Sequence, residues 1–325
     1  MPAIVLQEEF TWDFYLLAWL RRHSLLAFFA LTFGIDSARP YLVSSLPSLR
    51  HAPPYILAIV IALILIMFCG GPTLSSITLT GILGGKSGLR QLIRSAFNQD
   101  VDARWFITAL FLPAAVVWLP IMAINALLGG PVPPIFNPPG GVLSWWELVL
   151  LLYGVFIALA WTEEIGWRGF ALPRLQADRS ALSSSIILGV IWGIWHLPDR
   201  LSSQDFSCSY FVLFVIWTIA LSILFTWLYN NTKGNLRISI IFHAAINTTL
   251  SCMPIDRIEF FTLTVALMWV VAIIVVITFG PERLVLEPSK RSGGVEWLRS
   301  QWRNLLKDRS GISNTTTPFS PPPYG

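Results

Sequence analysis

Three polar clusters interrupt apolar segments of this sequence, and their side chains are of types that can do chemistry. The clusters are Glu163-Glu164-Ile-Gly-Trp-Arg168, Trp192-Gly-Ile-Trp-His196 and His243-Ala-Ala-Ile-Asn247. An ionisable side chain inside a membrane span costs roughly 2.5–3.5 kcal/mol on insertion scales, so its presence there indicates a functional site.

The first cluster contains two neighbouring carboxylates with different surroundings. On a helix, Glu164 and Arg168 are four residues apart and can form an ion pair on one face. Glu163 points about 100° away from this pair and is left for another role. A purely structural ion pair at a helix end remains an alternative for Glu164 and Arg168.

The other two clusters each place two side chains on one helix face. Trp192 and His196 are four residues apart, so the indole can pack against the imidazole. His243 and Asn247 share this spacing and present a histidine and a carboxamide together. A packing role for His196, and interhelical hydrogen bonding by His243 and Asn247, remain alternatives.

These residue types suit the hydrolysis of a peptide bond. A buried carboxylate such as Glu163 can act as a general base, and His196 beside it can hold and polarise a water molecule. His243 and Asn247 can donate hydrogen bonds to the oxyanion that forms on an attacked carbonyl. No G-x-S-x-G motif is present, so a serine nucleophile of that kind is not predicted.

A metal-assisted mechanism could use the same side chains. Glu163, His196 and His243 are residue types that bind zinc with water at an open position. However, the H-E-x-x-H motif is absent, and asparagine is a poor zinc ligand. We expect a metal-free glutamate mechanism that needs no cofactor, with zinc as the alternative.

The composition places these residues in a membrane protein. Of 325 residues, 54% are hydrophobic and only 12% are charged, and the mean hydropathy is +0.65. Soluble domains carry about twice this share of charge. The composition excludes a cytosolic enzyme and a nucleic-acid-binding module, and it makes the lipid bilayer an expected partner.

Eight segments are apolar and long enough to cross a bilayer, which takes about 17–25 residues. We expect an all-α, polytopic fold with spans at 24–46, 54–80, 105–128, 143–164, 181–197, 210–229, 236–252 and 260–279. The fourth can continue past Glu164, and Gly70-Gly71-Pro72 predicts a kink in the second. At 1.5 Å per residue, Glu164, His196 and His243 lie about 15, 22 and 12 Å deep, which favours one shared site.

Most of the 22 lysines and arginines fall on one side of these predicted spans. Cytoplasmic segments are enriched in these residues, so we predict a multi-pass protein with both termini cytoplasmic, in a bacterial plasma membrane. The predicted parts are a cytoplasmic N-terminal segment with an interfacial helix (1–23), a transmembrane domain (24–280, with the motifs in 142–252) and a basic, partly disordered tail (281–325). The loop between the second and third spans, with Lys86, Arg90 and Arg94, is predicted to be cytoplasmic.

In this order and on successive segments, E-E-x-x-x-R, aromatic-x-x-x-H and H-x-x-x-N resemble the motifs of the CPBP family of intramembrane proteases. That family includes the type II CAAX prenyl endopeptidases and bacterial relatives tied to bacteriocin maturation and immunity. The resemblance covers residues 142–252, about a third of the chain. The family's second motif usually begins with phenylalanine, where this chain has Trp192.

The resemblance implies a fold of about eight helices with a polar intramembrane cavity open to the cytoplasm. It implies that Glu163 and His196 activate water and that His243 and Asn247 form the oxyanion hole. The remaining motif residues, Glu164, Arg168 and Trp192, would support the site. The implied substrate is a membrane-associated peptide or a prenylated protein.

Two other function classes remain open. A proton-coupled transporter could use the same groups as a relay, but such proteins favour internal repeats, and none is visible. A membrane immunity or chaperone-like protein could carry the motifs without depending on catalysis. A Cys208–Cys252 disulfide is possible, and Asp36 and Arg39 in the first predicted span have no assigned role.

Overall fold

The computed structural model describes residues 15–37, 70–97, 100–127, 145–201, 206–251 and 258–286, together with residues 53 and 56. Every regular element in these ranges is a helix, which confirms the all-α prediction. The helices are α2 (Ser24–Ser37), α5 (Gly71–Phe97), α6 (Ala103–Leu127), α7 (Trp145–Gly166), the π-helix η3 (Trp167–Ala171), α8 (Leu172–Leu175), α9 (Ala181–Trp195), α10 (Leu197–Leu201), α11 (Cys208–Asn231), α12 (Leu236–Ser251) and α13 (Ile258–Phe279).

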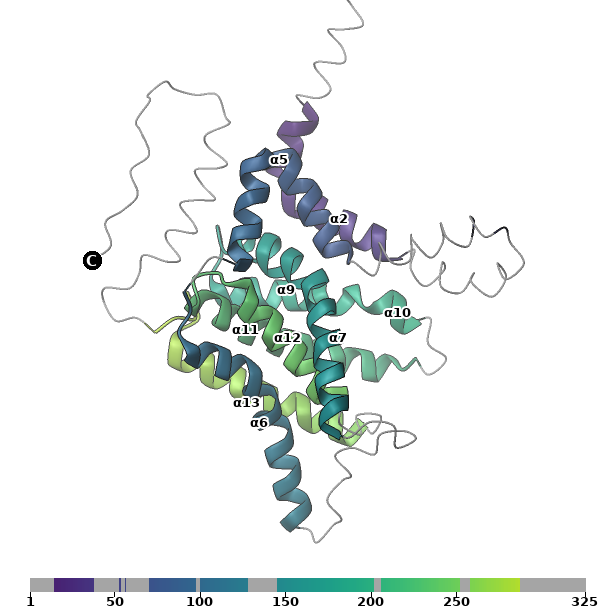
Figure 1. The fold of residues 1–325 in the computed structure, drawn as a ribbon, viewed down its shortest axis with the longest axis vertical. Helices are drawn as coiled ribbons and strands as arrows, with labels where there is room; N and C mark the ends of the chain where they lie inside the picture. The colour runs from purple at the N-terminus through teal and green to yellow at the C-terminus, as the bar shows by residue number, and fades with distance from the viewer. Residues whose placement is uncertain are drawn as a thin grey trace, which may run out of the picture.

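The helices pack around a central group made of α9, α11 and α12 (Figure 1). In this group α11 packs against α9 and α12, while α12 also contacts α6 and α7. On one side α2 packs on α5, and on the other α6 contacts α13 (Figure 1). The three segments that carry the polar motifs, α7, α9 and α12, therefore lie in or against the central group.

Four helical segments are long and apolar enough to cross a membrane. They are Trp146–Leu175, Ala181–Leu201, Cys208–Asn231 and Ile258–Phe279, and a bent pair near the N-terminus raises the number to as many as five. The multi-pass prediction is confirmed in this form. Eight spans, and a cavity open to the cytoplasm, remain predictions.

The bent pair consists of the helix Tyr15–Arg22 and α2, which meet at 90°. The side chains of Tyr15, Leu16 and Trp19 on the first helix are exposed. Exposed aromatic and apolar side chains on a helix perpendicular to a span are typical of the membrane–water interface. The interfacial position of this helix stays a prediction.

The connection predicted after the second span is helical. α5 (Gly71–Phe97) consists of two helices joined at a kink at Gly85, whose φ of 58° and ψ of −156° lie outside the helical region. Lys86, Arg90 and Arg94 lie on the helix after the kink, in agreement with the good helix propensity of lysine and arginine. The cytoplasmic location of this segment stays a prediction.

The predicted kink at Gly70-Gly71-Pro72 coincides with the start of α5. Gly70 has a φ of +82°, a left-handed conformation that favours glycine. A Cβ at Gly70 would lie 2.2 Å from the carbonyl oxygen of Thr162 on α7. The glycine therefore lets the start of α5 approach the backbone of α7 one residue before Glu163.

The fourth predicted span does continue past Glu164. The helical segment runs from Trp146 to Leu175, and its π-helical turn begins three residues after Glu164, at Trp167. π-Helical turns inside longer helices are frequent at functional sites. This turn places Arg168 in the core, where its side chain is only 1% exposed.

Helices α9 and α11 approach closely through two glycines four residues apart. A Cβ at Gly189 would lie 2.6 Å from the Cα of Ile219, and one at Gly193 would lie 2.6 Å from the Thr218 hydroxyl. Thr218 Oγ1 also donates to the Gly189 carbonyl at 3.0 Å. Small residues at this spacing are a known device for close helix packing in membranes, and here they fix the helix that carries Trp192 and His196.

Several smaller predictions fall on residues outside the described ranges. Cys208 is an exposed free cysteine, but Cys252, its possible disulfide partner, is not among the described residues. Arg39 and the basic tail beyond residue 286 lie outside the described residues.

Candidate functional site

The centre of the candidate site is a buried carboxylate on α7. Glu164 Oε1 accepts hydrogen bonds from Arg168 Nη1 and from His243 Nδ1, each at 2.8 Å. Glu164 is fully buried, and Arg168 and His243 are 1% and 4% exposed. Charge-assisted hydrogen bonds of this kind are strong where water is excluded. They join the first and third sequence clusters, although Glu164 and His243 are 79 residues apart.

Aromatic rings surround the guanidinium of Arg168. Its Cζ lies 3.7 Å from the ring centroid of Phe225 on α11 and 4.9 Å from that of Trp192 on α9. Such cation–π contacts stabilise a charge that has left water. Phe225 also packs against His243, with the ring centroids 5.8 Å apart. Phe225 could not be predicted as a site residue from the sequence, because it is one of many apolar residues on α11.

The second carboxylate, Glu163, has a different partner. Trp192 Nε1 donates to Glu163 Oε2 at 2.9 Å. Glu163 is half-buried, and it interacts electrostatically with His196 and His243. The prediction that Glu163 points away from the Glu164–Arg168 pair is confirmed, because its hydrogen bond goes to α9.

His196 stands at the end of α9 with its ring enclosed by aromatic side chains. Its Nδ1 lies 2.9 Å from the Trp192 carbonyl oxygen. A carbonyl oxygen only accepts, so Nδ1 carries the proton and Nε2 of the neutral ring is an acceptor. The ring centroid is 6.0 Å from that of Trp192, 4.7 Å from Trp195 and 5.1 Å from Phe214. The predicted packing of Trp192 on His196 is confirmed.

The structure thus brings most of the predicted side chains together. Hydrogen bonds, ring contacts or electrostatic interactions connect Glu163, Glu164, Arg168, Trp192, His196 and His243. Asn247 lies one helical turn beyond His243 on α12 and is half-buried. Its side chain makes no hydrogen bond to the described part of the chain.

The charges of this cluster do not balance with neutral histidines. Two carboxylates and the guanidinium of Arg168 leave one net negative charge when both imidazoles are neutral. Within the described ranges, no three histidine, cysteine, aspartate or glutamate side chains are arranged to hold a metal ion. The choice between a metal-free and a zinc-assisted reaction stays a prediction.

Asp36 is a further buried residue next to this cluster. It is 3% exposed, and its carboxylate accepts from Trp195 Nε1 at 2.8 Å and from the Gly71 backbone N–H at 3.3 Å. Trp195 in turn packs on His196. The sequence marked Asp36 as an acidic residue in an apolar segment, but it could not indicate a partner 159 residues away.

Residues 144–249 match the model of a family described as type II CAAX prenyl endopeptidase Rce1-like. A curated relative, CAAX prenyl protease 2 of Methanococcus maripaludis, is 26% identical over 175 residues, which cover 52% of this chain and 64% of the relative. The chain therefore aligns with about two thirds of the length of that relative. The matched residues include the three polar motifs and all four helices that carry or enclose them.

Proposed function

We propose that this chain, which belongs to the CPBP family through its Rce1-like residues 144–249, is an intramembrane endopeptidase. The observation that carries the proposal is that two adjacent glutamates have different hydrogen-bond partners. Glu164 accepts hydrogen bonds from Arg168 and His243, whereas Glu163 accepts one from the indole N–H of Trp192. Different surroundings suit different roles, one structural and one chemical.

Glu163 is the proposed general base. Trp192 binds one of its oxygens and fixes the carboxylate, which leaves the other oxygen to accept a proton from water. His196 presents Nε2 as an acceptor, because its Nδ1 donates to the Trp192 carbonyl. A water molecule between these two acceptors could donate both protons, and its oxygen lone pair would be directed at a peptide carbonyl.

His243 and Asn247 are the proposed oxyanion donors. His243 uses Nδ1 toward Glu164, so its Nε2 can donate only when the ring is protonated. The carboxylate of Glu164 supports such an imidazolium. The Asn247 amide, one turn further along α12, supplies a second donor with no proton transfer.

Zinc remains the alternative to this scheme. Glu163, His196 and His243 are the residue types that would bind it, but among the described residues they are not arranged to hold a metal ion. No step of the proposed reaction is therefore assigned to a metal. The metal-free reaction is the proposal because Glu163 and its neighbours already provide a base and two donors.

The proposed substrate is the C-terminal region of a prenylated protein. This part of the proposal follows from the name of the relative, a CAAX prenyl protease. A membrane protein with its reactive groups on buried helices also needs a substrate that enters the bilayer, and a prenyl chain provides such an anchor.

The experiment uses the full chain in liposomes with a farnesylated CAAX peptide, the same peptide without the farnesyl group, and an unprenylated membrane-spanning peptide. Products are identified by mass spectrometry, with and without a zinc chelator. We expect hydrolysis of the farnesylated peptide that the chelator does not inhibit. Loss of hydrolysis with chelator, restored by zinc, would contradict the metal-free reaction. If folded protein left all three peptides intact, the protease proposal itself would be wrong.

A further inference from the structure

A cavity lies apart from the residues of the candidate protease site. Its volume is about 390 Å³, and it is lined by the start of α2, one face of α5 and the turn after α8. None of the proposed catalytic or supporting residues lines it. Nothing in the proposed peptide hydrolysis uses this cavity.

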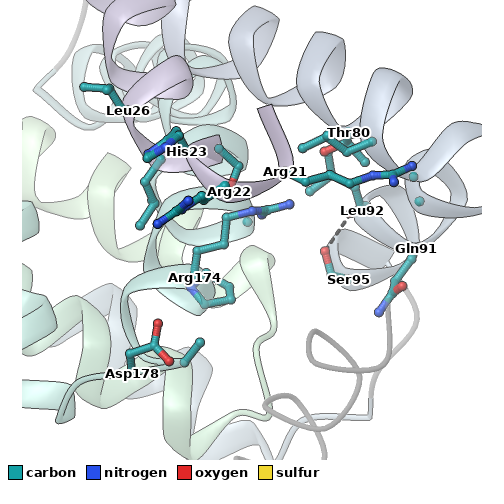
Figure 2. A pocket seen from close by; sticks show the side chains of 18 of the residues that line it. Arg21, Arg22, His23, Leu26, Thr80, Gln91, Leu92, Ser95, Arg174 and Asp178 are labelled. Carbon is teal, nitrogen blue, oxygen red and sulfur yellow. Dashed lines mark hydrogen bonds between the residues drawn. The ribbon is translucent and has the colours of Figure 1, made fainter. Parts of the chain in front are cut away.

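The lining of this cavity is basic. It contains Arg21, Arg22 and Arg174, against one carboxylate, Asp178. Figure 2 shows the side chains of the three arginines gathered around one space, with Asp178 at its edge. Guanidinium groups repel one another, so an anion between them is stabilised by each. Arginine also binds phosphate through paired N–H groups in a fixed fork geometry.

The side chain of Arg174 is held in place by Phe170. Its Nη1 donates to the Phe170 carbonyl at 2.8 Å, and its Cζ lies 3.4 Å from the ring centroid of Phe170. A side chain fixed in this way loses little conformational entropy when it binds an anion. Phe170 itself is stacked on Phe28 of α2, with centroids 5.0 Å apart, so Arg174 is supported by the same helix that follows Arg21 and Arg22.

Part of the remaining lining is apolar. Leucines from α2 and α5 contribute, namely Leu25, Leu26, Leu83 and Leu92. Leu26 is 58% exposed, so this end of the cavity reaches the surface of the helix bundle. A cationic part next to an apolar part fits an amphipathic anion better than a free inorganic one.

The position of the cavity in the fold matches this chemistry. Arg21, Arg22 and His23 stand at the 90° bend between the helix Tyr15–Arg22 and α2. A bend between an interfacial helix and a span lies at the level of lipid headgroups. This is also the side that the distribution of lysine and arginine predicts to be cytoplasmic, where clusters of basic residues attract anionic lipids.

We propose that this cavity binds the phosphate of an anionic phospholipid, with an acyl chain lying along the leucines of α2 and α5. The phospholipid would hold the N-terminal bend against α5 and the turn after α8. This proposal does not rest on the protease activity.

The test uses the full chain, delipidated in neutral detergent. It is titrated with phosphatidylglycerol, with phosphatidylcholine of the same acyl chains, and with inorganic phosphate, and bound ligand is counted by native mass spectrometry. The variants are Arg21→Gln and Arg22→Gln, and the matched control is Arg94→Gln. Arg94 is an exposed arginine of α5 that does not line the cavity.

We expect phosphatidylglycerol to bind more tightly than phosphatidylcholine, and each cavity variant to weaken its binding about fivefold, since one arginine near a membrane surface contributes about 1 kcal/mol. Arg94→Gln should bind as wild type does. Equal affinity for the two lipids, or equal weakening by Arg94→Gln, would overturn the proposal. If inorganic phosphate bound as tightly as phosphatidylglycerol, the phospholipid proposal would be wrong and the cavity would be a site for a free anion.

Discussion

At the scale of residues, Glu163 and Glu164 are adjacent carboxylates with separate surroundings. Glu164 is fully buried and receives hydrogen bonds from Arg168 and His243. Glu163 is half-buried and receives one from Trp192. Substitution of the two should therefore have different consequences, although the residues are chemically identical.

Glu164→Gln should lower both stability and turnover. The amide cannot neutralise Arg168, and breaking one side of a buried ion pair costs about 3–5 kcal/mol. Thermal unfolding in detergent measures the stability and peptide hydrolysis measures the turnover. A melting temperature equal to that of the wild type would contradict the supporting role of Glu164.

Trp192→Phe tests the hydrogen bond to the proposed base. Phenylalanine keeps an aromatic ring beside His196 and His243 but removes the donor to Glu163 Oε2. A hydrogen bond to a charged group contributes about 1.5–3 kcal/mol, so kcat should fall about tenfold or more. The matched control is Trp269→Phe, which removes an indole donor to the Ile216 carbonyl rather than to a proposed site residue. An equal effect of both substitutions would show that the Trp192–Glu163 bond has no special role.

At the scale of elements, the position of α9 depends on its approach to α11. Gly189 and Gly193 bring the two helices together. Trp192 lies between these glycines, and His196 is the C-cap of α9. A displacement of this helix would separate Trp192 from Glu163 on α7. The two helices and the site are therefore coupled through backbone packing.

Gly189→Val should reduce stability and activity together. Its Cβ would meet the Ile219 Cα at 2.6 Å and the Thr218 carbonyl oxygen at 3.0 Å, and overpacking of this kind costs about 1–3 kcal/mol. Gly154→Val on α7 is the control, because a Cβ at Gly154 meets nothing within 4 Å. Thermal unfolding and hydrolysis of both variants check this, and a stable, active Gly189→Val would contradict it.

At the scale of the whole molecule, Asp36 connects three helices. It belongs to α2 and accepts from the start of α5 and from Trp195 of α9. Trp195 packs against His196 with ring centroids 4.7 Å apart. Asp36 is therefore a positioning residue that acts on the site through Trp195.

Asp36→Asn should weaken this connection without removing its volume. Both oxygens of Asp36 accept hydrogen bonds, one from the Gly71 N–H and one from Trp195 Nε1. The NH₂ group of the introduced amide would replace one of these acceptors and face a donor, and an unsatisfied buried group costs about 1–3 kcal/mol. We expect a lower melting temperature, and a lower kcat with little change in KM, because His196 would be less well placed. A lower melting temperature with unchanged kcat would leave Asp36 with a structural role only.

The positions of most helices could be predicted from local features of the sequence. The apolar segments from residue 105 onward predicted α6, α7, α9, α11, α12 and α13 within a few residues, because span length and hydrophobicity are local properties. The spacing within each motif and the fixed rise of a helix also predicted that the polar groups meet at similar depths.

The partners of those groups could not be predicted in the same way. The Glu164–His243 and Asp36–Trp195 hydrogen bonds join residues 79 and 159 positions apart, and they depend on how the helices pack. The helix that carries Lys86 and Arg90 after the kink at Gly85 was not predicted, because charge indicates where a span ends but not whether the chain is helical beyond it.

The central claim is that Glu163 is the base of a peptide-hydrolysing site. The most direct measurement is single-turnover hydrolysis of the farnesylated peptide by wild type and by Glu163→Gln in liposomes, with thermal unfolding of each. Gln can still accept from Trp192, so the fold should be kept. The matched control is Glu147→Gln, sixteen residues earlier on the same helix and about 24 Å away.

Glu163→Gln should unfold at the wild-type temperature and hydrolyse the peptide about 10²–10⁴-fold more slowly, the usual contribution of a general base. Glu147→Gln should match the wild type in both measurements. Hydrolysis by Glu163→Gln at the wild-type rate, with its fold intact, would contradict the account.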